Sequence, residues 1–227
     1  MKSLRRPVVY QGVTYPEYKM DFYTSNVYGK RFKDRALKPR INHGYLTFHV
    51  YFEDSGFDVR QHQLLVETFP DLISESPIVS HHGLKRGNDR HELKTPMGFP
   101  FLCNMICPDH IDGNKRNNHH TNIMLVTQHE NRIKCGPVKG RKYKCVYTTP
   151  YGTYKVEIKF RSILDKNGKH FYICKNFKTE EEAALGYNTI LEEALLTIWG
   201  PDLGPKMYDF AYKNEVPALV QQELILR

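Results

Sequence analysis

The sequence predicts an α+β protein in which small sheets pack against short helices. Two segments, 44–53 and 154–160, alternate apolar with polar side chains, which is the period of a strand with one buried face. Thr127 and Thr179 are each followed three residues later by glutamate, and this capping-box spacing marks the start of a helix. We therefore expect a strand–strand–helix core, preceded by a small β-rich domain and followed by a three-stranded antiparallel sheet packed on one helix.

The composition favours a polyanionic partner and no membrane. The 227 residues include 33 Lys and Arg against 25 Asp and Glu, which gives a net charge of +8 and a pI of about 9.1. No apolar run approaches the roughly 18 residues of a membrane span, and the start has no apolar signal core. Five cysteines form no evident disulfide framework, which suits a reducing compartment.

Residues 1–70 are expected to form the β-rich domain and to contact DNA. Residues 1–40 hold ten Lys or Arg and three Asp or Glu, with a dense cluster at Lys30–Lys33. Such a cluster suits phosphate contacts, and a solvated loop is an equal alternative. After the strand at 44–53, Val59–Phe69 predicts a strand that runs into a short helix.

The residues that suggest chemistry lie in the core segment, 71–134. An apolar approach ends at Asp109 and His110, and a loop rich in Asn, Asp and Gly follows. Asn122 opens the next strand, and the helix after it carries Asn131 in its first turns. The layout thus brings a carboxylate, an imidazole and two carboxamides onto neighbouring elements.

This set suits metal-assisted hydrolysis of a phosphodiester. Asp109 and Asn131 offer oxygen ligands to a hard cation such as Mg²⁺, or Mn²⁺ in its place. His110 would be the general base that deprotonates water, and Asn122 would bond the loop backbone and hold His110. A decorative turn is the alternative. Neighbours on a regular strand point to opposite faces, so Asp109 and His110 can share a phosphate only if the strand ends or twists there.

The run D-H-x-D-G-N-K-x-N-N-x-x-x-N-I-x-x-V-T-x-x-x-N resembles the signature of HNH endonucleases, in the variant of phage and intron homing enzymes. The matching residues are Asp109, His110, Asp112, Gly113, Asn114, Asn117, Asn118, Asn122, Val126, Thr127 and Asn131. The resemblance implies a ββα-metal fold with His110 as base, Asn122 orienting it, and Asp109 with Asn131 on the metal. At the last position of this signature the family often has His, and Asn, here Asn131, is the alternative found in homing enzymes.

The segment before the core also resembles phage HNH homing enzymes, whose pattern is L-K-P, G-Y, an alternating strand and then H-R-L-V-x-x-x-F, where this chain has H-Q-L-L-V-E-T-F. Gln63 stands where that family usually has Arg, and Pro70–Pro108 looks like an insertion before the core. Two cysteines spaced C-x-x-x-C near three histidines could hold a structural zinc, and small core cysteines are the favoured alternative. The residues concerned are Cys103, Cys107, His81, His82 and His91.

Residues 135–142 predict a basic linker. Arg132–Lys144 contains six Lys or Arg and no acid, and Gly136-Pro137 with Gly140 disfavours a continuous helix. Such a segment commonly follows a phosphate backbone or a minor groove, and a plain solvated linker is the alternative. The residues expected to contact DNA in the linker and in the core loop are Lys115, Arg116, Lys139, Arg141 and Lys142.

Residues 143–212 predict a second unit with one free sheet face. Apolar residues alternate with charged or polar ones over 154–160 and 170–174, and the helix after Thr179 carries one apolar stripe. That helix would cover one face of three antiparallel strands, and the other face would be free to enter a DNA major groove. The side chains expected on the free face are Lys144, Tyr147, Tyr151, Lys155, Lys159 and Tyr172.

This unit resembles the plant ethylene-response-factor DNA-binding domain. Y-K-C-V-Y-T-T-P-Y-G-T-Y-K-V-E-I-K stands against Y-R-G-V-R-x-R-P-W-G-K-W-x-A-E-I-R, and F-K-T-E-E-E-A-A-L-G-Y stands against F-x-T-A-E-E-A-A-x-A-Y. The family reads bases with sheet Arg and Trp, where this chain has Lys and Tyr, so the plant target is not implied. A sheet that only packs against the core is the alternative. Residues 213–227 would be a tail with a short helix at Val216–Leu226.

Together these features predict a site-specific homing endonuclease that hydrolyses double-stranded DNA with a divalent metal. The chain holds one Asp-His-Asn-Asn set, so we expect a monomer that nicks one strand. We place it in the cytoplasm of a bacterial or phage-infected cell, by the resemblance. The alternatives are a sequence-specific DNA-binding regulator with an inactive core, and a nuclease for RNA or branched DNA.

Overall fold

The structure is a computed structural model that describes residues 3–29, 32–52, 55–86, 91–103, 105–218 and 221. Lys30 and Arg31 of the basic cluster, and most of the helix expected at Val216–Leu226, lie outside these residues. The chain divides into two compact units, and both are discontinuous in sequence. Unit 1 comprises residues 1–76 and 107–126, and unit 2 comprises residues 77–106 and 127–227. The expected functional segments cut across these units and stay a proposal.

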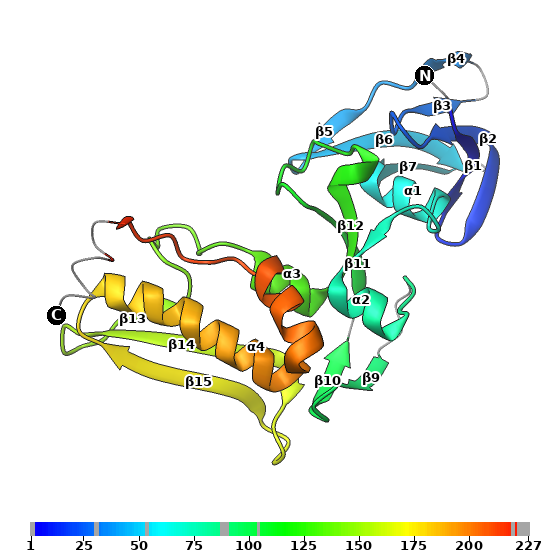
Figure 1. The fold of residues 1–227 in the computed structure, drawn as a ribbon. Coiled ribbons are helices and arrows are strands. Elements are labelled where there is room, and N and C mark those ends of the chain that lie inside the picture. Colours follow the sequence, from blue (N-terminus) through cyan, green and yellow to red (C-terminus); the bar gives the residue numbers. More distant parts are fainter. Residues whose placement is uncertain are drawn as a thin grey trace. The chain divides into compact units, whose positions relative to one another are not determined.

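The described residues of unit 1 form three small sheets, the α-helix α1 and a short 3₁₀ turn (Figure 1). Four antiparallel strands follow one another in the order β1-β2-β3-β4, and three more form the sheet β5-β6-β7. The elements are β1 (Arg5–Tyr10), β2 (Val13–Asp21), β3 (Val27–Gly29), β4 (Phe32–Ala36), β5 (Arg40–Asn42), β6 (Tyr45–Phe52), β7 (Ser55–Arg60) and α1 (Gln61–Thr68). The strand expected at 44–53 and the strand-to-helix step at 59–69 are confirmed.

Alternation explains why unit 1 folds this way. Phe48 and Val50 on β6 are buried while His49 and Tyr51 between them are more exposed, so one face of the strand supplies core. Leu64 and Leu65 of α1 are fully buried, and α1 packs against β1, β6 and β7. Burying each such side chain typically stabilises by about 1.5–3 kcal/mol.

The segment expected to carry the chemistry folds in the predicted order of strand, loop, strand and helix. β11 (Ile106–His110) is followed by the loop, the short 3₁₀ turn η1 (His120–Asn122) and β12 (Ile123–Thr127). β12 lies between β11 and β8 (Ser74–Glu75), and it pairs with β8 in parallel. The helix α3 (Gln128–Lys134) begins at Thr127, where both hydrogen bonds of the predicted capping box to Glu130 are present.

Unit 2 contains the predicted three-stranded antiparallel sheet and its covering helix. The elements are α2 (Pro77–His82), β9 (His91–Lys94), β10 (Pro100–Cys103), α3, β13 (Val146–Thr148), β14 (Tyr154–Leu164), β15 (His170–Phe177) and α4 (Glu180–Phe210). β14 pairs antiparallel with β13 and with β15, and α4 lies along these strands (Figure 1). Val156, Ile158 and Phe160 face the helix and are buried, as the alternation predicts.

Helix α4 starts at the predicted capping box of Thr179 with Glu182. Its apolar stripe is buried throughout, at Ala183, Tyr187, Ile190, Leu191, Ala194 and Ile198. The helix is kinked at Gly200, whose φ of 73° is open to glycine and is followed by Pro201.

The strands of residues 77–106 extend the C-terminal sheet. Phe101 of β10 pairs with Ile163 near the end of β14, and β9 continues the sheet beyond β10. Phe101 also packs edge-on against Trp199 of α4, with ring centroids 5.2 Å apart. The stretch expected as an insertion into the core therefore belongs by its pairing to the C-terminal sheet. In the described part of the chain, no helix is long and apolar enough to cross a membrane.

Candidate active site

His110 is the last residue of β11 and is nearly buried, with 4% of its surface exposed. Asp109 precedes it on the strand and is half-buried. The strand ends at His110, whose carbonyl accepts the Gly113 amide in a turn, at 3.0 Å. Asp109 and His110 could share a phosphate only if the strand ended or twisted at this pair, and β11 does end there.

Asn122 ties the loop that follows His110. Its Oδ1 accepts the Asp112 amide at 3.1 Å, and its Nδ2 donates to the Asn117 carbonyl at 2.7 Å and to Asp112 Oδ1 at 2.9 Å. The Ile111 amide donates to the Asn122 carbonyl at 2.8 Å. Asn122 therefore bonds the loop backbone, and through the loop it constrains where β11 ends.

The remaining loop residues are held as a turn. Asp112 accepts from Asn117 Nδ2 at 2.8 Å, from Asn122 Nδ2 and from the Asn114 amide at 2.7 Å. These donors, led by Asn117, hold the pKa of the Asp112 carboxyl below its usual value. Gly113 takes a φ of 72°, which the turn requires. For these positions the turn chemistry is a sufficient explanation.

A chain of buried carboxamides leads away from the His110 ring. Nε2 of His110 lies 2.7 Å from Asn118 Oδ1, and Asn118 Nδ2 donates to Gln61 Oε1 at 2.8 Å. Gln61 Nε2 donates to the Ser25 carbonyl at 2.6 Å, and the Ser25 hydroxyl returns to the Asn118 carbonyl at 2.5 Å. All four residues are at most 5% exposed. We call this set the carboxamide relay.

Aromatic and cationic groups surround the same ring. His62 of α1 meets His110 edge-on at 4.9 Å between ring centroids, and Tyr45 of β6 lies 6.2 Å from His110. Arg60 and Lys115 both sit over the Tyr45 ring, at 4.5 and 4.8 Å from its centroid. Two cations thus lie on the aromatic ring that neighbours His110.

Sequence reasoning gave no role to Asn118 and missed Gln61, His62 and Tyr45. Asn118 was a matched position of the motif without an assigned partner. Gln61 is a polar residue at the start of a helix whose other described side chains are largely buried, and that alone gives little signal.

Asn131 lies on α3 in unit 2 and is half-buried. Its Oδ1 accepts the Cys135 thiol at 3.7 Å, one helical turn away. Asp109 and Asn131 both supply oxygen donors, which fit a hard cation. Their convergence on one ion stays a prediction.

Within the described residues, no three His, Cys, Asp or Glu side chains form a group that could hold a metal. The structural zinc considered for Cys103, Cys107 and the nearby histidines therefore gains no support.

The residues expected to contact DNA lie in three parts of the chain: the sheet β13–β15 with its turn, the core loop and the linker. Tyr147, Lys155, Lys159 and Tyr172 lie on the side of β13–β15 that α4 leaves uncovered, and Tyr151 is 90% exposed in the β13–β14 turn. Lys155 is paired with Glu157 at 2.8 Å. In the core loop, Arg116 is exposed.

The linker cations differ in what they touch. Lys139 is exposed, and Arg141 stacks on Tyr147 at 4.1 Å. Lys142 pairs with Glu181 at 2.8 Å, and this partner raises the pKa of the ammonium.

Lys144 does not lie on the free face. It precedes β13, and its ammonium donates to the carbonyls of Arg132, Ile133 and Cys135 at 3.1, 2.6 and 2.6 Å. These carbonyls lie at the C-terminal end of α3 and at its C-cap residue Cys135, so Lys144 caps that helix. Burial lowers the pKa of the Lys144 ammonium. The expectation of a base contact from Lys144 is replaced by this structural role.

Comparison with known proteins gives a partial match. No family model matches the chain. The chain is 34% identical over 106 residues to an uncharacterized HNH endonuclease, L560, of Acanthamoeba polyphaga mimivirus, and this covers 46% of the chain and 49% of that relative. The chain thus spans about half the length of the curated relative.

A solved structure of DNA binding and cleavage by the HNH homing endonuclease I-HmuI aligns with 84% of this chain and 90% of that chain. The TM-score is 0.38 and the identity 18%. By the mimivirus match, the chain is similar over 106 residues to an HNH endonuclease.

Proposed function

We propose that the chain is a divalent-metal-dependent DNA endonuclease of the HNH homing type. The observation that carries the proposal is the carboxamide relay, which holds a buried histidine at the end of β11 in one orientation. The sequence similarity to an HNH endonuclease supports the same class.

The hydrogen-bond directions within the relay support Nδ1 of His110 as the nitrogen that acts as base. The Ser25 carbonyl can only accept, so Gln61 must turn its Nε2 toward it and its Oε1 toward Asn118. Asn118 then presents Oδ1 to His110, and the proton between them sits on Nε2 of the imidazole. Flipping either amide would place two acceptors or two donors face to face. Nδ1 of His110 is therefore left with the lone pair.

The proposed reaction begins when Nδ1 of His110 takes a proton from water. The hydroxide attacks phosphorus, and one ester oxygen leaves with the bond electrons. Asp109 and Asn131 would hold Mg²⁺ or Mn²⁺, and such an ion stabilises charge on the phosphate and the leaving oxygen. Asn122 keeps the loop closed so that the base stays at the end of β11.

DNA contacts would be divided among the segments. Residues 1–70 and the linker 135–142 would contact phosphates, through Lys139, Arg141 and others, and phosphate contacts position the protein. The face with Tyr147, Tyr151, Lys155, Lys159 and Tyr172, within segment 143–212, would select the site. One catalytic set in 71–134 would nick one strand, with the protein acting as a monomer.

A cleavage assay tests this proposal. Supercoiled plasmids and random-site libraries are incubated with the protein and Mg²⁺, Mn²⁺ or a chelator. We expect open-circle product that persists and needs metal, and that falls by about 10²–10⁴-fold in His110→Ala with DNA binding retained. Binding without any cleavage would favour the regulator with an inactive core. Cleavage that RNA or branched DNA competes away, but duplex does not, would favour the other nuclease class.

A further inference from the structure

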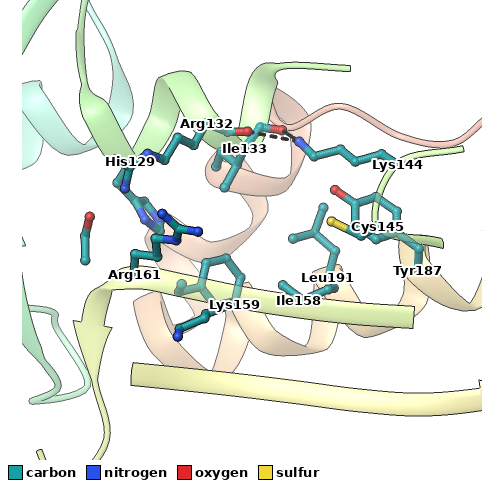
Figure 2. A pocket seen from close by; sticks show the side chains of 12 residues that line it. His129, Arg132, Ile133, Lys144, Cys145, Ile158, Lys159, Arg161, Tyr187 and Leu191 are labelled. Carbon is teal, nitrogen blue, oxygen red and sulfur yellow. Dashed lines mark hydrogen bonds between the residues drawn. The ribbon is translucent and has the colours of Figure 1, made fainter. Parts of the chain in front are cut away.

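A pocket of about 100 Å³ lies in unit 2 at the open edge of β14 (Figure 2). β13 pairs with β14 only as far as Val156, and β10 joins it only at Ile163. The edge between these points faces α3 and Cys145, whose carbonyl accepts the Glu157 amide at 3.1 Å. The pocket therefore lies between the end of β13 and the start of the pairing with β10, the two strands that share this edge of β14.

The lining of this pocket is cationic and contains no carboxylate. Its charged residues are Arg132 of α3, Lys144, and Lys159 and Arg161 of β14. Apolar side chains form the rest, including Ile133, Ile158 and Leu191. Positive charge gathered over a partly apolar floor favours an anion, because no acidic side chain in the lining neutralises it.

Three of these cations are available to a ligand. The Lys144 ammonium gives its three donors to two carbonyls of α3 and to the carbonyl of Cys135, which follows the helix, and Figure 2 shows the bond to Ile133 as a dashed line. Arg132, Lys159 and Arg161 are exposed, and no ion pair joins them to any carboxylate in the described part of the chain. Lys155 and Lys142, by contrast, have glutamate partners at 2.8 Å.

A histidine in the wall adds no charge. His129 is buried, and burial together with the nearby Arg132 lowers its pKa to about 3, so it is neutral at ordinary pH. It packs against Phe160 and Trp199, with ring centroids 5.5 and 5.9 Å apart. The attraction for an anion therefore comes from the exposed cations.

We propose that this pocket binds one phosphate group of the DNA backbone, held by Arg132, Lys159 and Arg161. Two guanidinium groups supply paired donors that match phosphate oxygens, and the lysine supplies a third charge. Lys159 and Arg161 belong to the uncovered side of β14, so the pocket extends the face proposed to select the site. The inference rests on the proposed function in that the chain must bind DNA.

The test uses the full chain without divalent metal, so that binding is measured apart from cleavage. Affinity for a duplex of about 20 base pairs is measured from low to physiological salt in wild type, Arg161→Ala and Lys159→Ala. Lys166→Ala is the matched control, since Lys166 is an exposed cation in the turn after β14. We expect each pocket variant to reduce the slope of log K against log salt more than the control does, by at most about 0.9, the share of one phosphate.

A second arm follows the pocket directly. Inorganic phosphate and then duplex are titrated into the protein while the amide NMR signals of Cys145 and Ser162, both pocket residues, are followed. We expect both ligands to shift these signals in wild type and Lys166→Ala, and an at least fivefold weaker response to phosphate in Arg161→Ala.

The outcomes separate the possibilities. If phosphate shifts the signals but the duplex does not, and all slopes are equal, the pocket takes free phosphate and the DNA assignment is wrong. If neither ligand shifts them while the duplex still binds, the pocket proposal fails and the nuclease proposal stands. If the duplex does not bind at all, both proposals fail.

Discussion

Replacing Asn118 with alanine would disconnect His110 from the rest of the relay. The change removes the acceptor for His110 Nε2 and the donor for Gln61 Oε1, and both of these groups are buried. A buried polar group left without its partner typically costs about 1–3 kcal/mol, so we expect a loss of roughly 2–6 kcal/mol in the free energy of unfolding of unit 1. The free energy is measured by urea denaturation.

The functional consequence is a histidine that no longer has one tautomer. We expect wild type to show a protonated Nε2 and an unprotonated Nδ1 in the imidazole ¹⁵N NMR shifts, and Asn118→Ala to show a mixture. Single-turnover cleavage under conditions where the variant remains folded should fall by about 10²-fold, within the usual range for a general base.

Asn118→Asp is the matched control. It keeps an acceptor on the His110 Nε2 proton and loses the donor to Gln61, so we expect the tautomer to be retained and cleavage to stay within about tenfold of wild type. A purely structural relay would make both variants lose stability and activity in proportion. Cleavage by a folded Asn118→Ala within threefold of wild type, with unchanged ¹⁵N shifts, would refute the reasoning.

Three further predictions concern the metal, a helix cap and a core histidine. Asp109→Ala and Asn131→Ala should each remove most metal-dependent cleavage, and the double variant little more, because ligands of one ion act as a unit; rate losses that multiply would contradict a shared ion. Lys144→Met should lower the free energy of unfolding by about 2–3 kcal/mol relative to the control Lys139→Met, because the Lys144 donors cap α3. The salt slope of DNA binding in Lys144→Met should equal that of the wild type. His129 is neutral in the fold down to about pH 3, whereas the unfolded chain takes up this proton below about pH 6.5. Stability should therefore fall by about 1.4 kcal/mol per pH unit as pH drops between these values, and His129→Phe should lack this component in acid denaturation curves.

Local patterns were enough to predict the elements. The alternation of β6 and β14 and the capping boxes at Thr127 and Thr179 depend on neighbours within a few residues, and all four appear in the structure. The loop fixed by Asn122 was predictable for the same reason, since its partners Asp112 and Asn117 lie close in sequence.

The relay could not be predicted, because its partners are remote. Asn118 is 57 residues from Gln61 and 93 from Ser25, and no periodicity links such positions. The attachment of β9 and β10 to the C-terminal sheet is equally long-range. Lys144 was misplaced because the free face was taken to begin before β13, whereas the α3 carbonyls that bind its ammonium leave no mark in the sequence.

The alternative of a decorative turn explains the loop but not the relay. Asp112, Asn114, Asn117 and Asn122 satisfy one another and the backbone, and a turn needs no more than that. The same loop would stand equally well if apolar side chains of similar volume filled the positions of His110 and its partners. Buried polar groups lose hydration and recover it only when every member of the network is satisfied. Compared with apolar side chains of similar volume, a chain of amides that starts at a backbone carbonyl and ends on one imidazole nitrogen therefore adds little stability, although removing one of its members alone is costly. What the whole chain of amides provides is a histidine with a defined tautomer. A general base needs that property, and a regulator with an inactive core does not.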